Sequence, residues 1–219
     1  MISGVAPHER AVQAMNSAKK HLGTPKGPKI LHPAYTYPNE NIGLATRCVP
    51  GKKENSAVFN HPVSWAILAE LLLGRGDQAW EYYQQALPMN PVVDIDRYEV
   101  EPYVYAEYVT SPDHPTFGQA SHTWLTGSAT WMLRDVVDFM LGIRPTYAGL
   151  MIDPCPPSEF KKYSVRRKFR GAIYKIDVEN PQGRNKGNLA ITIDGKPAKS
   201  NIVPVFPAGE EHLIKVIIQ

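Results

Sequence analysis

The feature of this sequence that most constrains its fold is a change of apolar periodicity near residue 150. Before that point, apolar residues recur at helical spacing over long segments; after it, short β-branched runs alternate between apolar and polar side chains. A period of 3.6 residues is typical of helices, and a period of two is typical of half-buried strands. The sequence therefore predicts a mainly α domain at residues 1–149 and a small antiparallel β domain at residues 150–219.

Four segments of the helical part carry helix signals, and residues 123–141 carry the clearest one. Leu125, Ala129, Met132 and Val136 form one apolar stripe there, and Gly142 is placed to end the helix. Successive helices joined by loops without strands indicate a helical bundle or an α/α toroid. The expected helices are residues 7–21, 62–73, 77–87 and 123–141, and the expected strands are residues 164–169, 172–178, 189–193 and 213–218.

Composition and charge exclude several classes of protein. The net charge of +3 over 219 residues is too small to indicate nucleic acid or a membrane as the main partner. The two cysteines are fewer than a secreted disulfide scaffold usually carries, and no CxxC or HExxH spacing indicates a metal site. Residues 1–10 lack the pattern of a signal peptide, and no apolar run is long enough to span a membrane. These features predict a reduced, cytoplasmic protein without a metal or a cofactor.

Two polar motifs stand at the beginnings of predicted helices. His61 follows a charged loop that contains Lys53, and it precedes a helix that is apolar almost all round. A histidine at this position either caps or packs against its helix or has a functional role. A single lysine such as Lys53 is weaker evidence of a functional site, because surface lysines are common. Thr126 and Gly127 lie in a predicted first helical turn, where free backbone N–H groups and the helix dipole attract anions. They indicate either a phosphate-binding turn or an ordinary helix start.

A third motif, residues 99–107, mixes carboxylates with tyrosines. Glu107 closes this stretch, and Tyr103 and Tyr105 lie within it. A carboxylate accepts hydrogen bonds from sugar hydroxyls while aromatic rings pack on the sugar face, so the motif predicts a sugar-binding site or an acid–base residue. The alternative is a solvated helix end. No Ser/His/Asp arrangement, Walker loop or dinucleotide-binding glycine pattern is recognisable.

In their chain order, these motifs resemble glycoside hydrolase family 94, which contains cellobiose, cellodextrin, chitobiose and cellobionic acid phosphorylases. The resemblance covers residues 5–195, and several long motifs in the right order argue against a chance match. The matching segments are residues 33–35, 50–55, 59–61, 101–105, 123–127, 141–145, 150–154 and 168–172.

The resemblance implies a fold and a reaction. The family's fold has an N-terminal β-sandwich, a helical linker, an (α/α)6 barrel and a small C-terminal β domain. This chain would supply the C-terminal half of the barrel and a small antiparallel β-sandwich domain. The implied reaction is reversible phosphorolysis of a β-linked disaccharide, in which inorganic phosphate inverts the anomeric carbon and gives an α-sugar 1-phosphate. An inverting hydrolase needs a second carboxylate to activate water, whereas phosphate is already an anionic nucleophile and needs only one general acid.

The resemblance also implies a role for each candidate residue. His61, Thr126 and the backbone of Gly127 match the family's phosphate-binding positions, while Lys53 and Glu107 match positions that hold hydroxyls of the donor sugar. Cellobiose phosphorylases commonly carry a glutamine where this chain has Glu107, which hints at a different donor or acceptor. The aspartic general acid of the family and a phosphate-binding arginine are expected upstream of residue 1, so no catalytic residue is assigned to this chain.

The leading hypothesis is therefore a C-terminal piece of an inverting phosphorylase that binds a disaccharide and inorganic phosphate and is inactive alone. A non-catalytic carbohydrate- or phosphate-binding remnant is the alternative, as is a subunit that complements a separate N-terminal piece. A third hypothesis, an inverting hydrolase on the same barrel, is disfavoured because water needs no anion site. The uncovered face of half a barrel also predicts self-association.

Overall fold

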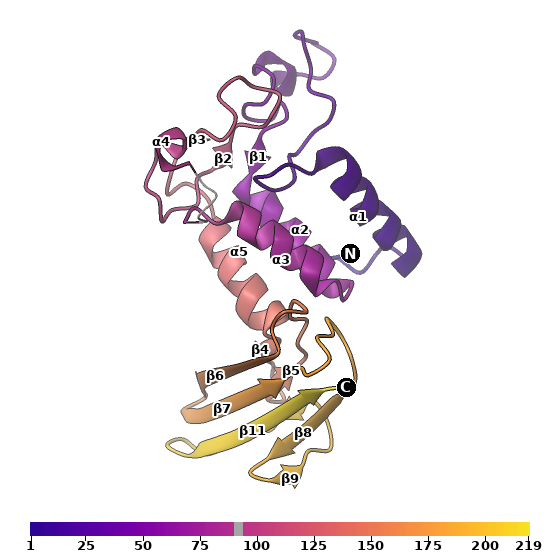
Figure 1. Cartoon of the computed structure of the whole chain (residues 1–219), viewed down its shortest axis with the longest axis vertical. Coiled ribbons are helices and arrows are strands. Elements are labelled where there is room, and N and C mark those ends of the chain that lie inside the picture. The colour runs from indigo at the N-terminus through magenta and orange to yellow at the C-terminus, as the bar shows by residue number, and fades with distance from the viewer. Residues whose placement is uncertain (90–93) are drawn as a thin grey trace. The chain divides into compact units, whose positions relative to one another are not determined.

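The computed structural model describes residues 1–89 and 94–219, which form two compact units (Figure 1). The first unit comprises Met1–Leu73 and Ala79–Leu133, and the second comprises Gly74–Gln78 and Arg134–Gln219. The domain division at residues 149/150 stays a prediction.

Helix α2 (Asn60–Leu72) lies in the core of the first unit. It buries Val63, Ile67 and Leu71, as its almost continuous apolar sequence predicts. No helix among the described residues is long and apolar enough to cross a bilayer. The other helical elements up to residue 134 are α1 (His8–Leu22), the 3₁₀ helix η1 (Leu44–Arg47), α3 (Gly76–Ala86), α4 (Ile95–Tyr98) and α5 (Ser128–Arg134).

The helix expected at residues 123–141 forms only in part. His122 and Trp124 have left-handed backbones with φ of 55° and 64°, so the chain turns before α5 begins at Ser128. After Arg134 the helix widens into the π-helix η2 (Asp135–Met140). Gly142, with φ of 71°, then ends it, as the sequence predicts.

A three-stranded antiparallel sheet connects the helices and loops of the first unit. It consists of β1 (Val58–Phe59), β2 (Tyr108–Val109) and β3 (Ala120–Ser121), in that order. Phe59 pairs with Tyr108, which pairs with Ser121. The sheet thereby joins three segments that lie far apart in the sequence.

The expectation of a mainly α fold, part of an (α/α)6 barrel, is wrong for this chain. Helices cover 28% of the structure and strands 22%, and the described residues contain five α-helices and three sheets. The physical reason lies in the long connections at residues 23–57 and 99–127. These are rich in proline and glycine, and their backbone polar groups bond across loops and short strands instead of along a helix.

The second unit contains a β domain, as predicted, but its larger sheet is not purely antiparallel. The five-stranded sheet has the order β6-β7-β11-β8-β9, and β11 runs parallel to β7 and antiparallel to β8 (Figure 1). The last strand, β11, lies between the earlier strands β7 and β8. The alternation of apolar and polar residues within a strand does not predict which strands become its neighbours. Its strands are β6 (Lys162–Phe169), β7 (Ala172–Glu179), β8 (Leu189–Ile193), β9 (Lys196–Pro197) and β11 (Glu211–Ile218).

A second, three-stranded sheet completes this domain. It has the order β10-β5-β4, formed by Ile202–Val203, Leu150–Ile152 and Ile143–Pro145. Both sheets bury side chains in one apolar core, in which Ile152 and Ile176 are fully buried. The burial of β7 alternates along the strand, as a period of two requires.

Candidate functional site

The small sheet β1-β2-β3 brings the predicted site residues toward one another. β1 leads directly into α2 and therefore positions His61, the second residue of that helix. Glu107 directly precedes β2, and its backbone N–H donates to the carbonyl of His122 at 2.7 Å. Asn60, 1% exposed, donates from its backbone to Glu107 and from its side chain to Ala106. The backbone around Glu107 is thus held on both sides.

Lys53 and Glu107, 54 residues apart in the sequence, form an ion pair. Lys53 Nζ donates to Glu107 Oε2 at 2.7 Å and lies 5.2 Å from the centre of the Tyr108 ring. The hydrogen bond that Lys53 donates to Glu107 is the largest cause that raises the pKa of Lys53, so the ammonium stays charged at neutral pH. Both side chains are partly exposed, at 34% and 22%. A charged donor and a charged acceptor therefore stand together where a ligand can reach them.

His122 adds a second nitrogen to this pair. Its Nδ1 lies 3.6 Å from Glu107 Oε2 and 2.7 Å from the Ser121 hydroxyl. The contacts of the described residues leave Glu107 Oε1 without a hydrogen-bond partner. An oxygen in that state accepts a hydrogen bond from a hydroxyl group, the chemistry that a sugar presents.

His61 lies beside Gly127, the other half of the predicted phosphate site. A Cβ built on Gly127 would lie 3.9 Å from His61 Cε1 and 3.8 Å from Trp131 Cδ1. The His61 ring packs against Trp65 and Trp131, at 4.9 Å and 6.3 Å between centroids. Its Nε2 is buried and has no hydrogen-bond partner in the described part of the chain. An unpaired buried nitrogen of this kind needs an explanation, and a ligand is one.

Thr126 and Gly127 form the turn that begins α5, and Gly127 is exposed. The Gly127 carbonyl accepts the first helical hydrogen bond, from Trp131, at 3.1 Å. The Thr126 hydroxyl lies 2.5 Å from the Ser128 hydroxyl and accepts from the Ser128 backbone. The turn therefore presents N–H groups at the positive end of a helix.

The other two glutamates of residues 99–107 are engaged elsewhere. Glu101 accepts from Trp124 Nε1 at 3.0 Å, and this bond is the largest cause that lowers the Glu101 pKa. Glu99 accepts from Gln119 at 2.7 Å. Neither bond involves the Lys53–Glu107 pair.

Three residues of this region were missed by sequence reasoning: His122, Trp65 and Trp131. The two tryptophans were visible only as apolar helix positions, because the contact that joins them, at 6.3 Å and nearly perpendicular, links two different helices. Nothing in the sequence indicates that His122 turns its ring toward Glu107, since that depends on its left-handed backbone.

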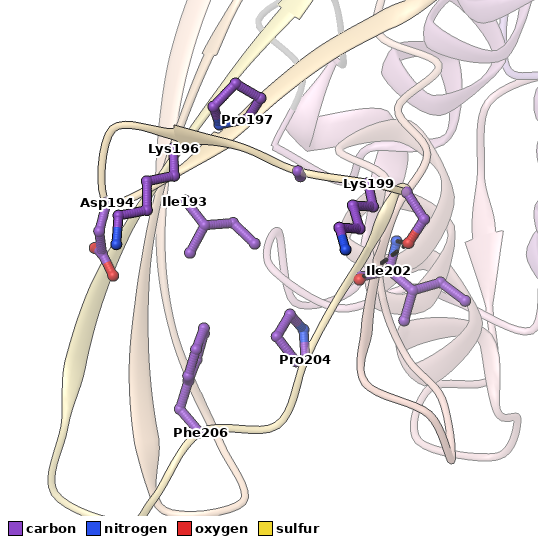
Figure 2. Close-up of a pocket in the computed structure, with 10 residues that line it drawn as sticks. Ile193, Asp194, Lys196, Pro197, Lys199, Ile202, Pro204 and Phe206 are labelled. Carbon is purple, nitrogen blue, oxygen red and sulfur yellow. Dashed lines mark hydrogen bonds between the residues drawn. The ribbon is translucent and has the colours of Figure 1, made fainter.

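The second unit contains a hollow of about 520 Å³ beside β8 and β9 (Figure 2). Ile193, Pro204 and Phe206 form its apolar wall, and Asp194 and Lys199 are among its polar lining residues. None of the residues predicted for the phosphate or sugar site lines it.

Among residues 1–89 and 94–219, no three His, Cys, Asp or Glu side chains gather as possible metal ligands. Both cysteines, Cys48 and Cys155, are free.

Comparisons with known proteins agree with the motifs. The model of the glycosyl hydrolase 94 superfamily catalytic domain matches residues 1–142. N,N'-diacetylchitobiose phosphorylase of Vibrio proteolyticus is 39% identical over 217 residues, which cover 99% of this chain and 27% of that protein. The enzyme of the same name from Vibrio furnissii is 38% identical over 218 residues, which cover 100% of this chain and 27% of the relative.

Solabiose phosphorylase of Paenibacillus borealis is 35% identical over 216 residues, which cover 99% of this chain and 28% of that protein. The chain thus spans little more than a quarter of the length of these relatives. Its family is nevertheless clear from the matched domain and from the motifs along the chain: it belongs to the glycosyl hydrolase 94 superfamily.

Proposed function

We propose that this chain is the phosphate- and sugar-binding part of an inverting disaccharide phosphorylase. The observation that carries the proposal is the unpartnered imidazole nitrogen of His61 beside Gly127, at the start of a helix. The substrates are a β-linked disaccharide and inorganic phosphate, and the reaction needs no cofactor. The names of the relatives, which are disaccharide phosphorylases, support this substrate class.

The phosphate half consists of His61, Thr126 and Gly127. The imidazole donates to one phosphate oxygen, the Thr126 hydroxyl to another, and the Gly127 backbone adds the positive end of the helix. Because His61 Nε2 is covered by its neighbours, an anion that reaches it must displace the Trp131 ring or the turn at Thr126–Gly127, in which Gly127 is exposed. Phosphate binding should therefore change tryptophan fluorescence.

The sugar half consists of Lys53 and Glu107. Lys53 donates to a sugar hydroxyl oxygen, while the free Oε1 of Glu107 accepts from a hydroxyl group. The pair is complete before the sugar arrives, so little ordering of long side chains is required at binding. No residue of this chain is assigned as the general acid, and binding rather than turnover is the direct test.

The experiment is a titration of the 219-residue chain with inorganic phosphate, in which binding is measured by calorimetry and by tryptophan fluorescence. The wild-type chain should bind phosphate, and His61→Ala should weaken binding about tenfold, the expected loss of one charge-assisted hydrogen bond. His8→Ala removes an exposed histidine of α1 and serves as the matched control. Equal phosphate affinity in the wild type and in His61→Ala would overturn the phosphate assignment.

A role as a subunit that associates with a second polypeptide is favoured by a separate observation. Large apolar side chains on α2, on α5 and in the turn before α5 are exposed: Trp65 44%, Leu72 46%, Trp124 73%, Leu125 65% and Leu133 63%. Exposed apolar area of this kind marks interfaces. We expect concentration-dependent association in light scattering and binding of a hydrophobic dye. A monodisperse monomer at high concentration that binds no dye would contradict this expectation.

A further inference from the structure

The loop at residues 49–57, which carries Lys53, has an unusual backbone. Gly51, Lys53 and Ser56 have φ of 82°, 49° and 83°. Glycine adopts this region freely, but a residue with a Cβ is disfavoured there. Lys53 and Ser56 therefore hold conformations that the surrounding structure must impose.

One carboxylate supplies much of that constraint. Asp113 Oδ2 accepts a hydrogen bond from the Ser56 hydroxyl at 2.5 Å and another from Lys29 Nζ, and the Ser111 hydroxyl lies 3.2 Å away. Ser56 is fully buried, and the Lys29 side chain is only 8% exposed. A single oxygen thus ties together three segments that are separated by up to 84 residues.

The backbone around Asp113 packs against the same loop. The Ser111 N–H donates to the Gly51 carbonyl at 3.0 Å. A Cβ on Gly51 would lie 2.7 Å from His114 Cβ, so the two segments are in direct contact. At the other end of the loop, the Ala57 N–H donates to the Lys53 carbonyl at 3.2 Å. This bond links the anchored Ser56–Ala57 end to Lys53 within one turn.

We propose that the Lys29–Asp113 ion pair, in which Lys29 is 8% and Asp113 28% exposed, is a positioning device that holds the 49–57 loop so that Lys53 meets Glu107. Asp113 acts through Ser56, and the ligand that Lys53 would then hold is a sugar hydroxyl, which rests on the proposed function. Burial raises the pKa of Asp113, but hydrogen bonds from Lys29, Ser56 and Ser111 lower it by more, so its net pKa is below the usual range and the anchor is charged at neutral pH.

The test measures the state of Lys53 directly, by competitive acetylation with acetic anhydride and mass spectrometry. Glu107→Gln removes the charged partner of Lys53, so the acetylation rate of Lys53 in this variant is the rate expected for a lysine that has lost its ion pair. Asp113→Asn should raise the acetylation rate of Lys53 about tenfold, because loss of the hydrogen bond to Glu107 lowers the pKa of Lys53 and makes its amine more accessible. Lys175, paired with Glu211 at 2.6 Å, is the internal reference.

Two further variants separate positioning from general loss of stability. Ser56→Ala leaves Asp113 in place and removes the hydroxyl that joins the loop to Asp113 and also contacts the Leu31 carbonyl at 2.8 Å, so it should raise Lys53 acetylation even if Asp113→Asn folds poorly. Asp138→Asn removes a different ion-paired carboxylate, 10% exposed and outside this loop, and it should leave Lys53 acetylation unchanged. Unchanged acetylation in folded Ser56→Ala and Asp113→Asn, or an equal rise in Asp138→Asn, overturns the proposal.

Binding of N,N'-diacetylchitobiose, measured by calorimetry on the same variants, distinguishes the two proposals. If Lys53 acetylation rises and disaccharide affinity falls together, both stand. If acetylation rises and affinity is unchanged, the positioning role of Asp113 stands and the sugar role of Lys53 is overturned. If acetylation does not change, the positioning role is overturned whatever the disaccharide does.

Discussion

Replacing Asp135 with asparagine should make the folded chain more stable at alkaline pH. Asp135 is the first residue of the π-helix η2 and is fully buried. Neither of its carboxylate oxygens has a hydrogen-bond partner within the described residues. Burial is the main cause that raises its pKa to about 8; Arg134 lowers the pKa and Asp138 raises it further. Asp135 is therefore largely protonated at neutral pH and becomes an uncompensated buried charge above it.

The size and sign of the effect follow from linkage. The ordinary pKa of an aspartate is 3.8, so the native state binds this proton more tightly than the unfolded chain does. The favourable contribution is fully present below pH 3.8 and is lost as the pH rises through about 8. At about 1.4 kcal/mol per pKa unit, the whole effect is at most roughly 6 kcal/mol. Asparagine has the same shape and no charge to bury, so it removes this loss.

The assay is urea unfolding of the wild type and Asp135→Asn at pH 5 and pH 9. The variant should exceed the wild type by about 2 kcal/mol at pH 5, where only the unfolded carboxyl group is ionised, and by roughly 6 kcal/mol at pH 9. Asp138→Asn is the matched control: it breaks ion pairs to Arg134 at 3.1 Å and Arg167 at 3.7 Å. It should destabilise the chain by about 1 kcal/mol at both pH values. A free-energy difference between Asp135→Asn and wild type that does not change with pH would refute the reasoning.

Three further predictions concern the sugar site, the β domain and the end of the π-helix. Glu107→Gln removes the charged partner of Lys53 and should weaken N,N'-diacetylchitobiose binding about tenfold in calorimetry; equal affinity would contradict the sugar role. Hydrogen bonds to Asp194 and then Glu210 raise the pKa of His212, so the stability it contributes is full below pH 6.5 and is lost as the pH rises through its folded pKa. His212→Asn should flatten thermal stability between pH 6 and 8, and an unchanged pH slope would exclude this role. Gly142→Ala should lower the free energy of unfolding in urea by more than about 2 kcal/mol, because φ is 71° and a Cβ would lie 2.2 Å from Pro154 N. A urea midpoint equal to that of the wild type would contradict this prediction, since it would mean that the turn accommodates the Cβ.

Elements whose pattern is local were predictable from the sequence. The helix expected at residues 62–73 is α2, Asn60–Leu72, and the strand expected at residues 189–193 is β8, Leu189–Ile193. The nearly continuous apolar sequence of α2 predicts that the helix is buried, whichever elements pack against it. The sharp end of the η2 helix at Gly142 is likewise local, because only glycine takes its positive φ without strain.

What the sequence did not reveal depends on contacts between distant segments. The strands β1, β2 and β3 have two residues each, too few for any periodicity to show, yet they bring Lys53, Glu107 and His122 together. The parallel pairing of β7 with β11 is also non-local. The barrel expectation failed because the long connections between the predicted helices bond their backbone polar groups across loops and short strands, which the sequence pattern does not show.

The Lys53–Glu107 pair shows how far residue types alone can take the argument. Glutamate near tyrosines indicated sugar binding, and the family resemblance added Lys53, but neither indicated that Lys53 and Glu107 would bond to each other at 2.7 Å. A hydroxyl that binds there can accept from Lys53 and donate to Glu107 Oε1 without separating the ion pair. The strained backbone of Lys53 and the Asp113 anchor then have a common explanation, since a charged pair that must stay fixed needs a loop that cannot relax.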